Sequence, residues 1–206
     1  MIHDDRYFIA VYGGSFDPPH LGHVEILKAL CENPFCLHII LLPNYRNPLK
    51  SQTCFKADKR LAMCQILAQM CHEKIHTSPY EIEQNRPTHT IQSLRALQGK
   101  SPYPHLKMCF VLGSDSLATL HLWKEAQSLC EMIEFIVITR ECKSQAHGVK
   151  PKHNITPRIR EHISIPRYNS LSSSKVRELL HSGKIQDALT MIPAQLHSFI
   201  HAHFKL

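Results

Sequence analysis

Short, continuous apolar runs alternate along this chain with longer amphipathic segments, and no other feature of the sequence constrains the fold as strongly. The apolar runs are residues 7–12, 38–42, 107–112 and 134–139. Between them lie segments such as 21–31 and 56–72, whose apolar residues recur at helical spacing. A continuous apolar strand fits a parallel sheet covered on both faces, and strands that alternate with helices imply βαβ units. The pattern predicts an α/β fold: a Rossmann-like, doubly wound parallel sheet flanked by helices.

The C-terminal part of the sequence predicts helices without further strands. A helical segment follows the serine run at 170–174 and ends at Gly183, and residues 193–204 form a last amphipathic segment. The polar stretch 141–154 predicts a surface loop. We therefore expect a single domain over residues 1–206, with a small helical part from about residue 171 to the end.

Composition indicates a soluble protein with a real core. The apolar fraction is 43%, no apolar run is long enough to cross a bilayer, and residues 1–6 do not resemble a signal peptide. We therefore expect a cytoplasmic protein that does not bind membranes. The eight cysteines form no C-x-x-C pair, which favours reduced thiols over zinc ligands or disulfides, and Cys109 lies in an apolar run typical of the core.

The net charge of +7 allows two kinds of anionic partner. One is a nucleic acid, bound by a basic, non-enzymatic module. The other is a small polyanion such as ATP. The lysines and arginines are scattered rather than gathered in one basic stripe, which favours the small polyanion and argues against a nucleic-acid partner.

The segment from Gly13 to His23, with the sequence GGSFDPPHLGH, follows the first predicted strand and opens the first predicted helix. In open α/β sheets ligands bind at the carboxyl ends of the strands, and the start of a helix offers N–H groups that suit phosphate. His20 and His23 are three residues apart and so share a helix face, where both imidazoles can donate to one phosphate.

A second segment, Leu171–Arg177 with the sequence LSSSKVR, also precedes a helix. Its serines can simply cap that helix, or its hydroxyls and guanidinium can bind an anion.

Together these two segments resemble the paired motifs of the nucleotidylyltransferase superfamily, G-[ST]-F-D-P-x-H-x-G-H and I-S-S-[ST]-x-[IV]-R. The segments between them are similar to bacterial nicotinate-nucleotide adenylyltransferases over nearly the whole chain. The similar stretches are LPN at 42–44 with NPLK at 47–50, Glu81 to Leu94, GSD at 113–115, Trp123 with Lys124, and Arg140 at the end of a strand. The chain departs from that family's pattern at Asn47 and Leu49, which stand where the family has proline and histidine.

The resemblance implies an enzyme that moves AMP from ATP to nicotinate mononucleotide without a covalent intermediate, with His20 and His23 as the catalytic residues. It implies two sets of binding residues. ATP would contact Gly14, Ser15, Phe16, His20, His23, Lys50, Asp115, Ser173, Ser174 and Arg177. Nicotinate mononucleotide would contact Gly13, Asp17, Asn44, Thr90, Trp123 and Arg140.

The only metal that we expect is Mg²⁺, carried by the ATP phosphates rather than by a protein site, because acidic side chains are few. Related adenylyl- and cytidylyltransferases, such as one using pantetheine phosphate, remain alternatives within the superfamily. The sequence leaves the oligomeric state open, and also the choice between the nicotinate and nicotinamide forms of the acceptor.

Overall fold

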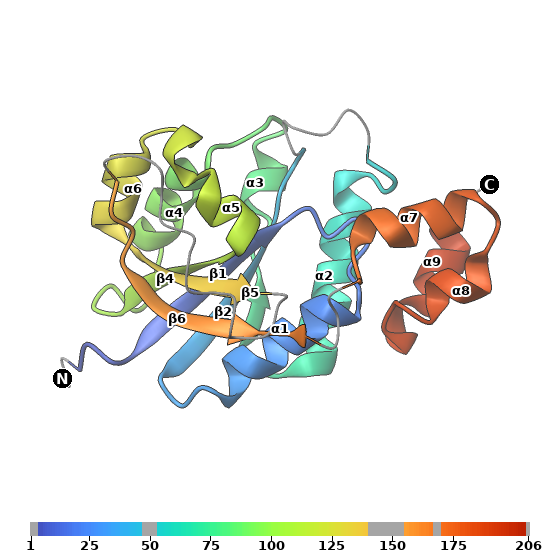
Figure 1. Ribbon diagram of the computed structural model, residues 1–206, viewed down its shortest axis with the longest axis horizontal. Coiled ribbons are helices and arrows are strands. Elements are labelled where there is room, and N and C mark those ends of the chain that lie inside the picture. Colours follow the sequence, from blue (N-terminus) through green and yellow to red (C-terminus); the bar gives the residue numbers. More distant parts are fainter. Residues whose placement is uncertain (1–3, 47–52, 140–154, 167–169, 205–206) are drawn as a thin grey trace.

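The computed structural model describes residues 4–46, 53–139, 155–166 and 170–204, and their centre is a six-stranded parallel sheet (Figure 1). Every neighbouring pair of strands runs parallel, in the order β3-β2-β1-β4-β5-β6. The strands are β1 (Phe8–Gly14), β2 (Cys36–Pro43), β3 (Ile75–Thr77), β4 (Lys107–Gly113), β5 (Glu134–Thr139) and β6 (Ile159–Ser164). The predicted Rossmann-like, doubly wound sheet is confirmed.

Helices cover both faces of this sheet and separate its core into two layers (Figure 1). On one face α1 (Leu21–Glu32) and α2 (Ala57–Cys71) bury their apolar sides against the strands. On the other face lie α4 (Thr90–Gly99), α5 (Ser114–Ala118) and α6 (Ala126–Met132). Cys109 of β4 is fully buried, which confirms its predicted place in the core.

The C-terminal helices form a third apolar cluster, at one end of the molecule beside α2 (Figure 1). These elements are α7 (Ser173–His181), α8 (Ile185–Leu189), the 3-10 turn η3 (Ala194–Leu196) and α9 (His197–His203). Their buried side chains pack with Phe55 and with Met63 of α2. Among the described residues, none of the helices is long and apolar enough to span a bilayer.

The predicted strands and long helices all occur, but two edge strands and several short elements were not predicted. The elements that the sequence reading missed are β3, β6, α3 (Tyr80–Glu83), α5, the 3-10 turn η1 (Leu120–Leu122), α6 and α8. β6 is polar along most of its length, and Arg160 within it pairs with Glu134 of β5 at 2.5 Å. An edge strand needs only one apolar face, so β6 lacks the continuous apolar run that identified the central strands. The predicted loop at 141–154 lies outside the described residues.

The strand order places the ligand crevice of such a fold between β1 and β4. The chain runs outward from β1 through β2 to β3, and then returns to β4 and runs outward through β5 to β6. Neighbouring β1 and β4 therefore send their following loops to opposite faces, which opens a crevice at their carboxyl ends. The loop that follows Gly14 at the end of β1 leads directly into α1, so the first sequence motif lies at this point.

Candidate active site

His20 and His23 lie against one another at the start of α1. His20 is the N-cap residue, is 5% exposed, and accepts the Gly22 N–H through Nδ1 at 3.1 Å. The Nδ1 of His23 accepts the His20 N–H at 3.0 Å, and the two ring centroids are 3.8 Å apart. A neutral imidazole that accepts through Nδ1 carries its hydrogen on Nε2. The backbone thus selects the tautomer in which both rings present an Nε2–H donor, next to the amide groups of a helix N-terminus.

Aromatic packing holds the second of these rings. Phe16 is buried and has a positive φ of 48°, and its ring lies 5.0 Å from that of His23. Tyr12 of β1 contacts Phe16 edge-on, with 5.4 Å between the ring centroids. Phe16, predicted as an ATP ligand, thus supports the His23 ring from the sheet side; its contact with ATP stays a prediction.

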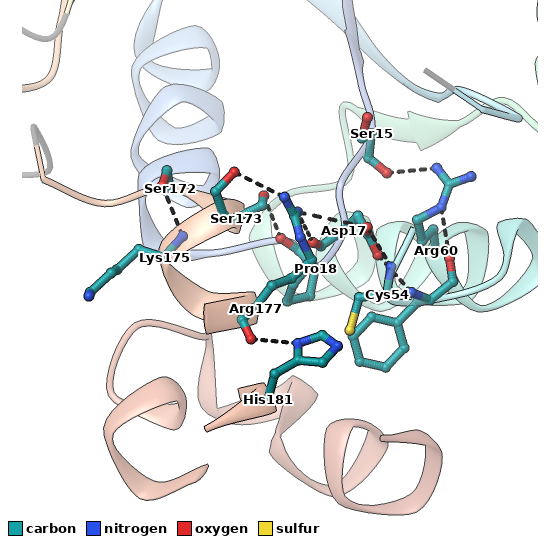
Figure 2. Close-up of polar contacts among 12 residues, drawn as sticks. Ser15, Asp17, Pro18, Cys54, Arg60, Ser172, Ser173, Lys175, Arg177 and His181 are labelled. Atoms are coloured by element: carbon teal, nitrogen blue, oxygen red, sulfur yellow. Dashed lines mark hydrogen bonds and ion pairs between the residues drawn. The ribbon is translucent and has the colours of Figure 1, made fainter. Parts of the chain in front are cut away.

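The second motif packs directly onto the first, as Figure 2 shows. Ser173, at the start of α7, donates to the Pro18 carbonyl at 2.9 Å. Arg177 donates to the Asp17 carbonyl at 2.7 Å through Nη1 and to the Ser174 hydroxyl at 2.9 Å through Nη2. The two segments that were predicted to hold one triphosphate therefore form a single unit, although about 150 residues separate them in the chain.

Asp17 is the buried anion of this unit, at 1% exposed. Its carboxylate accepts the Cys54 and Phe55 N–H groups at 2.9 and 2.8 Å, and Oδ2 lies 3.8 Å from Arg177 Nη1. This geometry joins the loop after β1 to the segment that precedes α2 (Figure 2). The structure thus engages both carboxylate oxygens with the backbone, and the predicted contact of Asp17 with the mononucleotide stays a prediction.

The end of β2 lies beside the end of β1. The Asn44 N–H donates to the Gly14 carbonyl at 2.9 Å, and the Asn44 side-chain amide donates to the Ser15 hydroxyl at 3.3 Å. Gly14, Ser15 and Asn44, which were predicted to bind two different nucleotides, therefore lie together at the carboxyl ends of β1 and β2.

Arg60 of α2 is a site residue that the sequence reading missed. It is fully buried and donates four hydrogen bonds, to the carbonyls of Ser15 at 2.7 Å, Tyr45 at 2.6 Å and Phe55 at 3.2 Å and to Asn44 Oδ1 at 3.3 Å. Burial lowers the pKa of the guanidinium, and the charge of Asp17 partly offsets this effect. The signal was present in the sequence: Arg60 occupies the apolar face of the 56–72 segment, in line with Cys64 and Leu67.

Gly13 and Trp123 meet the same aromatic side chain. A Cβ atom on Gly13 would lie 2.8 Å from the ring of Phe110 in β4, so packing against this ring excludes a larger residue. The half-buried ring of Trp123 contacts Phe110 edge-on, at 6.1 Å between the centroids. This contact gives Trp123 a packing role, while its predicted stacking on a pyridine ring remains a prediction.

The other predicted ligands occupy helix starts or lie outside the described residues. Asp115 is exposed in the first turn of α5, directly after β4, and the half-buried Thr90 is the first residue of α4. Each helix begins on the carboxyl side of the sheet, where a ligand would bind. Lys50 and Arg140 fall outside the described residues, so their predicted contacts stay predictions.

The Cys54 thiol, which lies beside this unit, is poorly suited to nucleophilic chemistry. Cys54 donates its N–H to Asp17, and burial together with the Asp17 charge raises the pKa of its thiol to about 11. A thiol with such a pKa stays protonated near neutral pH, and the thiolate is the nucleophile. The cysteines of the described residues are all free thiols, and these residues contain no cluster of three or more histidine, cysteine or acidic side chains that could hold a metal ion.

Glu81 links the two short helices on the β2 side of the site. It is 7% exposed and accepts the Ser93 hydroxyl at 2.6 Å, and burial raises the pKa of its carboxyl to about 7 despite this hydrogen bond. Glu81 in α3 thereby holds the first turns of α4, which begins at Thr90.

We predict that Glu81 makes the stability of the protein depend on pH. In the unfolded chain the carboxyl ionises near its ordinary pKa of 4.5, whereas in the folded chain it ionises near 7. The stabilisation by the neutral carboxyl is complete below about pH 4.5 and is lost as the pH rises through about 7, on the order of 3 kcal/mol in total. Glu81→Gln should therefore raise the free energy of unfolding at pH 8 and leave it nearly unchanged at pH 4.5, as measured by urea unfolding. An equal effect at both pH values would contradict this assignment.

Comparison with known proteins identifies the family. The cytidylyltransferase-like sequence profile matches residues 11–179. A Helicobacter hepaticus protein named as a probable nicotinate-nucleotide adenylyltransferase is 40% identical over 96% of both chains. A Sulfurovum protein with the same name is 33% identical, over 86% of this chain and 87% of its own length.

Solved structures support the fold. The Plasmodium falciparum nicotinic acid mononucleotide adenylyltransferase complexed with NaAD superposes with a TM-score of 0.74, at 24% identity and over 95% of both chains. At 24% identity this structural similarity supports the fold alone. The sequence relatives bear on the family: the chain belongs to the cytidylyltransferase-like family and, within it, to the nicotinate-nucleotide adenylyltransferases.

Proposed function

We propose that this protein transfers the AMP unit of ATP to nicotinate mononucleotide, giving nicotinate adenine dinucleotide and pyrophosphate, in one direct in-line displacement. An oxygen of the mononucleotide phosphate forms a bond to the α-phosphorus of ATP, and the bond from that phosphorus to the β-phosphate oxygen breaks. The names of the relatives support this choice of substrates. The Plasmodium falciparum protein, with the same fold, is complexed with NaAD.

The observation that carries the proposal is the junction of the two motifs. Ser173 and Arg177 of α7 donate to the Pro18 and Asp17 carbonyls. His20 is two residues after Pro18, so α7 lies next to the histidine pair. Two helix N-termini, two Nε2–H donors and a guanidinium therefore converge on one region at the carboxyl end of β1. Such a set of donors suits a triphosphate.

The proposed chemistry needs no nucleophile from the protein. The attacking phosphate is already an anion, so catalysis consists of positioning two polyanions and stabilising the charge that develops at phosphorus. His20 and His23 donate to the α-phosphate oxygens, while Ser174 and Arg177 hold the rest of the triphosphate. The raised pKa of the Cys54 thiol is consistent with a route that forms no thiol adduct.

Magnesium fits this site as a partner of ATP rather than as a resident metal. The donors that line it are hydroxyls, imidazoles and backbone N–H groups, and the oxygens of Asp17 accept backbone N–H groups instead. Mg²⁺ usually keeps several waters and binds through substrate phosphates, and when bound it neutralises charge on the phosphate oxygens.

The assay that tests this proposal offers the purified chain ATP, Mg²⁺ and one acceptor at a time. The acceptors are nicotinate mononucleotide, nicotinamide mononucleotide and pantetheine phosphate, and pyrophosphate release is measured together with the adenylylated product. We expect the nicotinate form to give the highest kcat/KM. A higher kcat/KM with pantetheine phosphate, or no pyrophosphate with any acceptor, would overturn the assignment.

The stereochemistry at phosphorus tests the single displacement. With ATP that is chirally labelled at the α-phosphorus, one in-line step inverts the configuration. A covalent adenylyl-enzyme would require two steps and would give retention.

We predict that Trp123→Ala raises the KM for nicotinate mononucleotide about 10-fold or more and leaves the KM for ATP near its wild-type value. The reason is the loss of stacking between the indole and the pyridine ring, which is worth about 1–3 kcal/mol for a base on an aromatic side chain. Trp123→Phe keeps an aromatic face and its packing on Phe110, and serves as the matched control. Equal rises in both KM values would show that Trp123 acts through packing alone.

A further inference from the structure

Arg60 makes more hydrogen bonds than are needed to hold two loops together. Three of its donors bind backbone carbonyls, at Ser15, Tyr45 and Phe55, and these bonds alone fasten the loops after β1 and β2 to the start of α2. Figure 2 shows the contact between Arg60 and Ser15. The fourth contact is different, because Nη1 also donates to a side chain, Asn44 Oδ1, at 3.3 Å.

That contact decides which way the Asn44 amide faces. A guanidinium has donors and no acceptor, so the oxygen of the amide must face Arg60 and its NH₂ group must face the other way. On that other side lies the Ser15 hydroxyl, 3.3 Å from Asn44 Nδ2. The Ser15 oxygen therefore accepts from Asn44.

An accepting hydroxyl keeps its own hydrogen for a further bond. Among the described residues, Asn44 is the hydrogen-bond partner of the Ser15 hydroxyl. Ser15 directly follows the last residue of β1, is half-buried, and is five residues before His20. The remaining donor thus lies at the carboxyl end of β1, where the proposed nucleotides would bind.

We propose that Arg60, acting through Asn44, is a positioning residue that makes Ser15 a hydrogen-bond donor to a phosphate oxygen of the bound nucleotide. The chain of bonds runs from Arg60 Nη1 to Asn44 Oδ1, from Asn44 Nδ2 to Ser15 Oγ, and from Ser15 Oγ–H to the ligand. A bond at each step polarises the next, and the last one is made to a charged acceptor, where hydrogen bonds are strongest. The inference rests on the proposed function, because the acceptor is a substrate phosphate.

The test is a double-mutant cycle in the full-length chain with Ser15→Ala, Asn44→Leu and the double variant. kcat and both KM values are measured with ATP and nicotinate mononucleotide. If Asn44 acts through Ser15, each single change should lower kcat/KM about 10-fold or more, and the double variant should be no worse than the poorer single one. The substrate whose KM rises identifies the phosphate that Ser15 contacts. Losses that multiply in the double variant, or an unchanged kcat/KM for Asn44→Leu, would overturn the inference.

Asn33→Leu is the matched control for a purely structural asparagine. Asn33 accepts the Phe35 N–H at 2.9 Å and donates to Glu161 at 2.9 Å, between α1 and β2 and away from the crevice. We expect this change to lower the thermal midpoint and to leave kcat/KM within about 2-fold. A similar loss of kcat/KM in Asn33→Leu would show that the Asn44 effect is structural, and would also overturn the inference.

If Asn44→Leu does not fold, Asn44→Asp tests whether residue 44 acts through Ser15. The aspartate still accepts from Arg60, but its second oxygen also accepts and so draws the Ser15 hydrogen away from the ligand. Its loss of kcat/KM should be about 10-fold smaller in a Ser15→Ala background than in the wild type, whereas equal losses contradict the inference. The wild type is assayed first. If it makes no dinucleotide, the proposed function is wrong. If it is active but the effects of the Ser15 and Asn44 substitutions are additive, only the role of Asn44 and Arg60 is wrong.

Discussion

His23→Ala should lose about 10²–10³ in kcat while the protein remains folded. The loss follows from removing one donor to the charge that develops at the α-phosphorus, and such a donor typically contributes this much. His23 is half-buried, accepts the His20 N–H and packs against Phe16, so we expect the change to lower the thermal midpoint somewhat without unfolding the protein. Steady-state kinetics and the thermal midpoint separate the two effects.

Two further variants make the His23 result specific. His23→Asn keeps an oxygen that can accept the His20 N–H but cannot place a donor where Nε2–H lies, so we expect a loss close to that of His23→Ala. His162→Ala removes an exposed histidine of β6 and should keep full turnover. A kcat for His23→Ala within about 10-fold of the wild type would remove the proposed role of this imidazole.

Arg60→Met should lower the free energy of unfolding by about 3 kcal/mol or more. The methionine fills much of the same volume, but it leaves the buried Phe55 carbonyl, the half-buried Ser15 and Tyr45 carbonyls and the Asn44 amide without their donor. Each unsatisfied buried acceptor costs about 1–3 kcal/mol, and the neighbouring charge of Asp17 loses part of its compensation. Urea unfolding, followed by the fluorescence of the single tryptophan, measures the change.

Arg95→Met is the matched control for Arg60→Met. Arg95 also lies on a helix and pairs with Glu125 at 2.8 Å, but half of its side chain is exposed. An exposed ion pair contributes about 1 kcal/mol or less, so this change should have little effect. Equal destabilisation by the two substitutions would show that the buried hydrogen bonds of Arg60 contribute no more than a surface contact.

Much of the fold could be predicted from local patterns alone. β1, β2, β4 and β5 are continuous apolar runs because both faces of a central strand are covered, and α1, α2 and α7 keep their apolar residues at helical spacing. β6 was missed because an edge strand buries one face, and α3 and α8 because four or five residues are too few to show a helical period.

Some features of the candidate site could likewise be predicted from contiguous motifs, whereas others depend on tertiary packing. The sequence alone identified the histidine pair at the start of α1 and the serine-led start of α7, because each is a contiguous string before a helix. It assigned Asp17 and Asn44 to ligands without any indication of their protein partners. In the structure Asp17 binds the backbone at residues 54–55, and Asn44 lies between Arg60 and Ser15.

By itself, then, the sequence determined the sheet, its helical layers and the positions of the two motifs proposed to bind phosphate, because periodicity and contiguous strings are properties of neighbouring residues. Only the tertiary structure decided that Ser173 and Arg177 bind the loop 155 and 160 residues before them, and that a buried arginine orders that loop. Such contacts depend on how the strand order folds distant segments together. A hydrogen bond between two distant segments produces no repeating pattern in the sequence, so the sequence alone could not predict it.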